Sequence, residues 1–185
     1  MNLYHYYDKR SGPFKSLTAL SNEEAFLVLE KIKAQRPDSF TAQRDMDYII
    51  KRSNCEAVVR EKAKEKGVIM DIASPHYMVV EACPWLSSWF EEAAEISIPI
   101  DEFDTGKISF TYGDSMPTFS PRVNDGKEYR KTVYTCEEIL GIIEKYGLPQ
   151  EWNADGAYGP ERYIEAQIWT DDPIERYVKI NRTIV

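Results

Sequence analysis

The chain has 185 residues, of which 43% are hydrophobic and 29% are charged, and its net charge is -8. This length and composition predict one globular domain, residues 1–185, that needs neither a disulfide nor a metal ion to fold. The excess of acidic residues disfavours binding to nucleic acids and to anionic membranes, because both are themselves negatively charged.

The expected elements alternate irregularly between strands and helices. Capping boxes, each a Ser or Thr followed three residues later by Glu, mark two helix starts, at Ser21 with Glu24 and at Thr135 with Glu138. The segment 101–106 is expected to join the strands 96–100 and 108–112. The order is typical of an α+β single domain with a mostly antiparallel mixed sheet and N-terminal helices. Apolar periodicity and turn residues predict strands at 3–7, 76–82, 96–100, 108–112, 129–134, 162–169 and 174–180, and helices at 22–35, 39–67, 85–94 and 136–147.

Cysteine usage and the N-terminus favour a cytoplasmic location. Cys55, Cys83 and Cys136 are widely spaced and odd in number, so reduced thiols in a reducing compartment are expected. The N-terminus lacks the basic and then apolar pattern of a signal peptide. No apolar run approaches the roughly 18 residues of a membrane span.

Few side chains stand out as candidates for chemistry, and no phosphate loop, dinucleotide fingerprint, nucleophile elbow or metal motif is present. Glu165 lies in an alternating strand beside Tyr163 and Gln167. Its carboxylate is therefore either half-solvated on an open sheet face or part of a pocket that would raise its pKa. His5, in the first strand, is either a packing residue or a donor that positions a polar ligand.

Two long loops, residues 113–126 and 150–160, are candidates for contact with a substrate or partner. Asp114 and Ser115 directly follow a strand, and Trp152 belongs to the second loop region. The carboxylate of Asp114 is alternatively an acceptor within its own turn. A carboxylate-based metal enzyme would need Asp114 and Asp155 to converge, and nothing in the spacing requires a metal.

Five segments together resemble a family of bacterial proteins of about this length whose activity is not assigned. The resemblance covers essentially the whole chain and implies a bacterial, cytoplasmic protein, but it adds no site. The segments are 76–80 (HYMVV), 83–86 (CPWL), 112–117 (YGDSMP), 125–131 (DGKEYRK) and 159–167 (GPERYIEAQ).

The order of elements is also similar to the ADP-ribosyltransferase fold, although the central Ser-Thr-Ser motif of that family is missing. The resemblance implies NAD as the cofactor, contacted by His5 and by Tyr77 as the central aromatic residue. It makes Glu165, on a late strand, the catalytic carboxylate, with His5 orienting the nicotinamide ribose.

The competing hypothesis is a non-enzymatic module that binds a protein or peptide through the loops 113–126 and 150–160. The enzyme requires His5 and Glu165 in one cleft, whereas the binding module requires an exposed apolar or aromatic patch. A homo-oligomer is compatible with both hypotheses.

Overall fold

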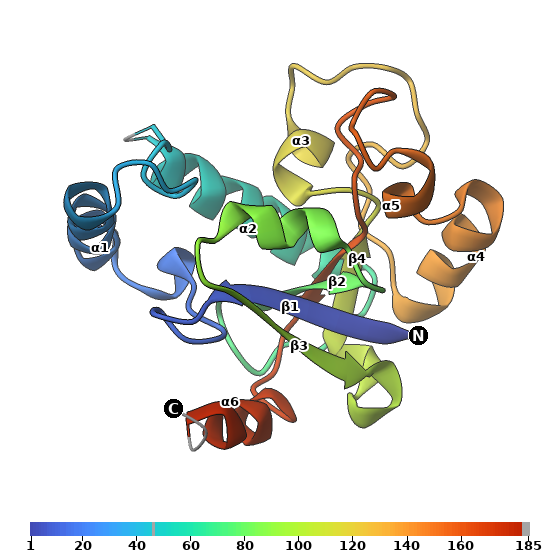
Figure 1. The fold of residues 1–185 in the computed structure, drawn as a ribbon. Coiled ribbons are helices and arrows are strands. Elements are labelled where there is room, and N and C mark those ends of the chain that lie inside the picture. Colours follow the sequence, from blue (N-terminus) through green and yellow to red (C-terminus); the bar gives the residue numbers. More distant parts are fainter. Residues whose placement is uncertain (46, 183–185) are drawn as a thin grey trace.

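The computed structural model describes residues 1–45 and 47–182. Met46, which the sequence pattern assigns to the apolar stripe of the second helix, lies outside the described residues. The fold is α+β, with one five-stranded sheet in the order β3-β1-β2-β5-β4 (Figure 1). All neighbouring strands are antiparallel. The strands are β1 (Asn2–Asp8), β2 (His76–Val80), β3 (Ala93–Pro99), β4 (Ile108–Thr111) and β5 (Glu165–Ile168).

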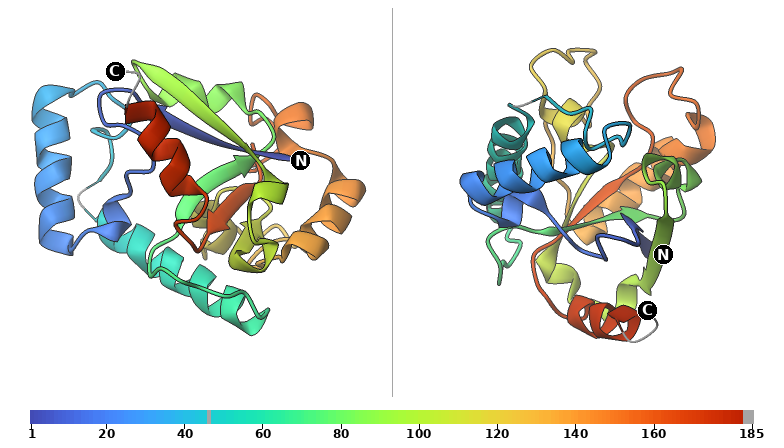
Figure 2. Two further views of the ribbon diagram at one scale, coloured as in Figure 1. Left: turned by 90° about the horizontal axis from the view of Figure 1, so that it is seen from below. Right: turned by 60° about the vertical axis from the view of Figure 1, so that its left-hand side comes forward.

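Helices pack against both faces of this sheet. The right-hand view of Figure 2 shows α6 on the opposite side of the sheet from α1 and α2. The α-helices are α1 (Asn22–Gln35), α2 (Tyr48–Glu65), α3 (Ser115–Phe119), α4 (Cys136–Tyr146), α5 (Pro149–Trp152) and α6 (Ile174–Arg182). The 3-10 helices are η1 (Leu17–Ala19), η2 (Pro84–Trp89), η3 (Ile100–Glu102) and η4 (Thr105–Lys107).

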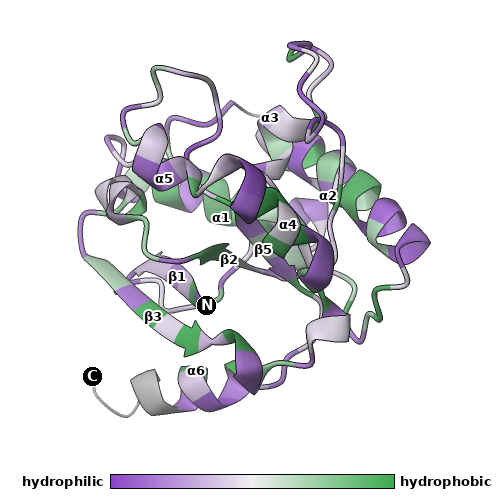
Figure 3. Ribbon diagram, turned by 90° about the vertical axis from the view of Figure 1, so that its right-hand side faces the viewer, coloured by the Kyte–Doolittle hydropathy of each residue, from purple (hydrophilic) through white to green (hydrophobic). Residues whose placement is uncertain are grey.

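Alternation along the strands divides the sheet into an apolar face and a mixed face. Leu3, Met78 and Ala166 share the apolar face and pack with Ile139 of α4 and Ile174 of α6. The mixed face is covered by α1, α2 and η2. Along α2 and α4, hydrophobic and hydrophilic stretches alternate (Figure 3), as expected for helices that bury one side. The mixed face is therefore the one that can hold a polar site.

Both predicted capping boxes are present. The Ser21 hydroxyl accepts from the Glu24 backbone N–H at 3.3 Å, and the Glu24 carboxylate accepts from the Ser21 N–H at 3.0 Å. Thr135 and Glu138 make the same reciprocal pair at 3.3 and 2.9 Å. These bonds satisfy N–H groups that a helix start leaves without partners, and they explain why α1 and α4 begin where the sequence predicts.

Replacing Thr135 with alanine is expected to lower the free energy of unfolding by about 1 kcal/mol, because the first turn of α4 loses a capping bond. Urea denaturation measures this change. Glu144→Ala, at an exposed position inside the same helix, is the matched control and should change stability by less than about 0.5 kcal/mol. Equal effects of the two substitutions would show that the cap contributes nothing specific.

Two predicted strands are wrong. Residues 129–134 form only an isolated bridge between Phe110 and Tyr134, and Lys131 has a φ of 57°, which interrupts an extended chain. Residues 174–180 belong to α6 instead of a strand. Ile174, Tyr177 and Val178, three and four positions apart, contact the same apolar core, which is the spacing of a helix.

The boundaries of two helices also differ from the expectation. The second helix begins at Tyr48, because residues 37–44 form turns and bends. The helix expected at 85–94 is the shorter η2, and β3 already begins at Ala93. Strands β3 and β4 occupy opposite edges of the sheet. The segment between them, which the sequence predicts as their connection, contains η3 and η4.

No helix in the described ranges, 1–45 and 47–182, combines the length and the apolar character that crossing a membrane requires.

Candidate functional site

A cavity of about 750 Å³ lies over the mixed face of the sheet. Its walls come from β1, β2 and β5 below, and from α1, the start of α2, η2 and residues 39–44 around and above. Aromatic residues of this wall include Tyr4, Tyr6, Phe40, Tyr48, Trp89 and Tyr163. The size and lining are those of a small-molecule site.

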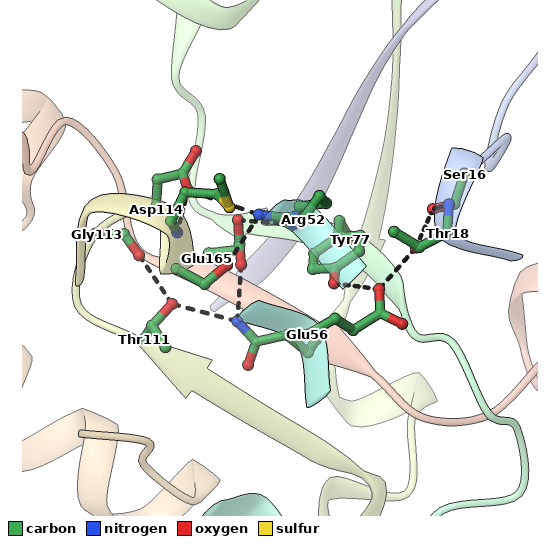
Figure 4. A network of polar contacts seen from close by, with 12 residues as sticks. Ser16, Thr18, Arg52, Glu56, Tyr77, Thr111, Gly113, Asp114 and Glu165 are labelled. Carbon is green, nitrogen blue, oxygen red and sulfur yellow. Dashed lines mark hydrogen bonds and ion pairs between the residues drawn. The ribbon is translucent and has the colours of Figure 1, made fainter. Parts of the chain in front are cut away.

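Arg52 and Glu165 form an ion pair at one end of the cavity. Arg52 extends from α2, and its Nη2 lies 3.5 Å from Oε2 of Glu165 on β5. Its Nη1 donates to the Ser115 hydroxyl at 2.9 Å and lies 3.7 Å from Oδ1 of Asp114. The ring of Tyr77 stacks against the guanidinium at 4.2 Å. Arg52, Tyr77, Asp114 and Glu165 converge from α2, β2, the start of α3 and β5 (Figure 4).

The Glu165 carboxylate is buried and bonded on its other side as well. Gln167 donates to Oε1 of Glu165 at 3.0 Å and to the Thr111 hydroxyl at 3.2 Å. The Ser109 hydroxyl in turn donates to Oε1 of the Gln167 side chain at 2.8 Å, which fixes the orientation of the side-chain amide. Burial raises the pKa of Glu165, against the opposing effect of Arg52. The sequence leaves open whether Glu165 is half-solvated on an open sheet face or part of a pocket, and the structure places it in a pocket.

Asp114 and Ser115 turn inward to the same site. Asp114 caps α3 by accepting from the Met116 N–H at 2.7 Å, and it also accepts from the Tyr163 hydroxyl at 2.9 Å. The predicted loop 113–126 therefore begins with a short helix whose cap belongs to the cavity. Asp114 acts as a turn acceptor and as a member of the site at once.

His5 lies on the other face of the sheet from Glu165. Alternation along β1 and the pairing of Leu3 with Val80 place the His5 side chain with the apolar face. Its Nδ1 lies 2.9 Å from the Tyr77 carbonyl, and its Nε2 accepts from the Phe14 N–H at 2.8 Å. Since a carbonyl only accepts, Nδ1 is the protonated nitrogen. Burial lowers the pKa of His5 to about 4. The ring is neutral, and both of its nitrogens are bonded to backbone groups. His5 and Glu165 both line the cavity, but their side chains lie on opposite faces of the sheet, so the imidazole does not contact the carboxylate.

Tyr77 lies on the mixed face and supports the site through two neighbours. Its ring stacks on Arg52, and its hydroxyl donates to Oε2 of Glu56 at 2.7 Å. The buried Glu56 carboxylate also accepts from the hydroxyls of Thr18 and Ser74, each at 2.7 Å. These bonds tie η1, α2 and β2 together beside the cavity (Figure 4).

Trp152 is not part of this site. It ends α5 and packs with the apolar core, and its indole N–H donates to the Tyr112 hydroxyl at 3.3 Å. Trp152 also lines a second pocket, together with Tyr129 and Tyr146. The structure therefore unites Glu165, Tyr77, Asp114 and Ser115 and leaves Trp152 elsewhere.

Arg52 is the site residue that the sequence interpretation missed, because it belongs to a helix crowded with charges of both signs. A signal was present in the spacing. Tyr48, Arg52 and Glu56 recur every four residues, so they form a polar row along one side of α2. The same helix buries Ile49 and Val59, which lie next to this row. A polar row so close to the buried side of a helix indicates that its side chains contact the rest of the protein and not only solvent.

The fold and site define an α+β protein with an aromatic cavity that ends at a buried arginine–carboxylate pair. Comparisons with protein-family models, with curated proteins and with solved structures found no match. Among the described residues, no group of three or more His, Cys, Asp or Glu side chains is arranged to hold a metal ion.

Proposed function

We propose that the cavity binds a nicotinamide nucleotide and that Glu165 acts at its ribose, as in an ADP-ribosyltransferase. The observation that carries the proposal is the position of Glu165, a buried carboxylate with a raised pKa at one end of an aromatic cavity. Carboxylates with perturbed pKa values in such cavities are typical of catalytic sites.

The chemistry requires cleavage of the bond between the ribose C1′ and the nicotinamide nitrogen. Nicotinamide leaves as a neutral molecule with the bonding electron pair, and positive charge develops on the ribose ring. Glu165 stabilises this charge or accepts a hydrogen bond from a ribose hydroxyl. An acceptor hydroxyl or water then bonds to C1′ and releases its proton to solvent. Arg52 and Gln167 hold the carboxylate in place throughout.

The shape and lining of the cavity are consistent with this ligand. Tyr4, Tyr6 and Tyr163 offer aromatic surface near the carboxylate, on which a nicotinamide or adenine ring can stack. A volume of about 750 Å³ lies within the range of pockets for ligands of this size. In this proposal His5 is a positioning residue that joins β1 to β2 and to the segment around Phe14, without touching the ligand through its ring nitrogens.

Replacing Glu165 with glutamine is expected to reduce nicotinamide release from NAD at least about 100-fold, because the carboxylate charge is lost where positive charge develops. Binding of NAD, measured as a rise in melting temperature, should persist. Glu95→Gln, an exposed carboxylate on β3, serves as the matched control and should retain full turnover. Full turnover by the Glu165 variant would refute the proposed role.

The alternative function, a peptide-binding module, would use the loops 113–126 and 150–160. Asp114 lines the cavity, Ser115 is bonded to Arg52, and Trp152 packs against the core. Within the described residues of 113–126 and 150–160, Tyr158 is the one large hydrophobic side chain that is strongly exposed. A single exposed ring is not a docking patch. Should NAD fail to shift the melting temperature, a partner pull-down would be the next experiment.

The state of the cysteines agrees with a reducing compartment. Cys55, Cys83 and Cys136 are free thiols, and burial raises the pKa of each. Unreactive free thiols are expected of a bacterial cytoplasmic protein.

A further inference from the structure

One arginine of the cavity, Arg44, makes no ion pair with any carboxylate in the described part of the chain. Three arginines line the cavity, and two are paired: Arg36 with Asp8 at 3.3 Å, and Arg52 with Glu165 at 3.5 Å. No carboxylate among residues 1–45 and 47–182 lies within ion-pair distance of Arg44, although the chain carries 31 acidic residues. The positive charge of Arg44 is therefore available to a ligand.

Aromatic rings hold the Arg44 guanidinium in place. It stacks over the Tyr48 ring at 3.8 Å and over the Phe40 ring at 5.0 Å. Phe40 itself stacks on Trp89 of η2 at 4.3 Å, which anchors this segment on the far side of the cavity. Stacking uses the flat face of a guanidinium and leaves its N–H edge free to donate two parallel hydrogen bonds. Arg44 is thus preorganised for a ligand with paired oxygens.

Tyr48 places a second free donor next to Arg44. Tyr48 lines the cavity, and its hydroxyl makes no hydrogen bond with any described residue. Burial raises the pKa of Tyr48, so the hydroxyl keeps its proton at neutral pH. Arg52 lies one helical turn further along α2, but its guanidinium is already bonded to Ser115 and paired with Glu165.

We infer that Arg44 and Tyr48 bind the phosphate groups of the ligand, so that the cavity is specific for phosphorylated nucleotides. The guanidinium edge and the phenol together offer donors to an anion with several oxygens, in an aromatic surrounding that suits the attached base. The inference rests on the proposed function for the location of the ligand. It adds the chemical class of the ligand and two residues that the resemblance to ADP-ribosyltransferases does not assign.

The test measures binding of ADP and of adenosine by calorimetry. ADP carries the phosphates but no nicotinamide, so its binding is independent of any reaction at Glu165. Wild-type protein should bind ADP at least about tenfold more tightly than adenosine. Arg44→Met should remove most of that difference, Arg44→Lys should restore part of it, and Tyr48→Phe should weaken ADP a few-fold. Arg122→Met, at an exposed arginine in the 113–126 loop, controls for the change in net charge and should bind ADP normally.

The outcomes separate this inference from the proposed function. Equal binding of ADP to wild-type protein and to Arg44→Met would overturn the inference, whatever the activity of the Glu165 variant. The inference would also be overturned if the wild-type protein did not bind ADP or preferred adenosine. Binding of ADP that depends on Arg44, in a protein that leaves NAD intact, would support the inference and refute the transferase chemistry.

Discussion

Replacing Arg52 with methionine is expected to lower the free energy of unfolding by about 3–5 kcal/mol at neutral pH, the usual cost of removing one partner of a buried ion pair. Arg52 is 12% exposed and Glu165 is 6% exposed, so water screens the pair only weakly. Without the guanidinium, Glu165 and Asp114 face each other with no cation between them. Urea denaturation at pH 7 measures the effect.

A double-mutant cycle isolates the ion pair from other consequences of the substitution. Arg52→Met combined with Glu165→Gln should be more stable than Arg52→Met alone, because the uncompensated carboxylate is then absent. Arg122→Met again serves as the control for the lost positive charge and should cost less than about 0.5 kcal/mol. A loss of less than about 1 kcal/mol in the free energy of unfolding for Arg52→Met would show that water screens the ion pair and that it is not effectively buried.

Acidification below pH 6.5 is expected to destabilise the protein through His5. The pKa of His5 falls from 6.5 to about 4 in the folded chain, so the unfolded chain binds a proton that the native chain does not. The contribution of His5 to stability is complete above pH 6.5 and is lost progressively as the pH falls toward 4. Over this window the loss amounts to about 3 kcal/mol.

Comparison with His5→Gln separates this loss from the titration of the carboxylates. The variant keeps a side chain that can hydrogen-bond but has no group that titrates at this position. It should be less stable than the wild type at pH 7, and the difference should shrink toward pH 4. Denaturation curves at pH 7, 6, 5 and 4 measure the difference. A constant difference across this range would show that the His5 ring is accessible to protons in the folded state.

The sequence predicts best those features that depend on neighbours in the chain. The starts of α1 and α4 follow from capping boxes, whose two partners are three residues apart. The alternation of 162–169 predicts β5 and places Glu165 and Gln167 on one face. Where local patterns are ambiguous the prediction is wrong, as for residues 174–180, whose apolar residues fit a strand and a helix alike.

In the candidate site too, the sequence identifies some residues, whereas others are revealed only by contacts between distant segments. Glu165, Tyr77 and Asp114 are identifiable from the sequence as polar or aromatic residues at strands and strand ends. Their common neighbour Arg52 is not, since it lies 62 positions before Asp114 and is drawn to it only when α2 packs on α3. His5 is identifiable as a residue of interest, but its role depends on two backbone groups, those of Tyr77 and Phe14.

By itself the sequence determined the α+β class, the strands that build most of the sheet and the candidate carboxylate Glu165, because these depend on periodicity and on contacts between near neighbours. Tertiary structure alone decided that Glu165 is buried beside a cation, that the His5 side chain lies on the opposite face of the sheet, and that Arg44 stacks on aromatic rings without an ion-pair partner among the described residues. Each of these depends on which distant side chains meet across the sheet. Burial and ion pairing set the pKa of a side chain and decide whether it is available to a ligand. Both depend on contacts between segments that are distant in the sequence, so no single segment predicts them.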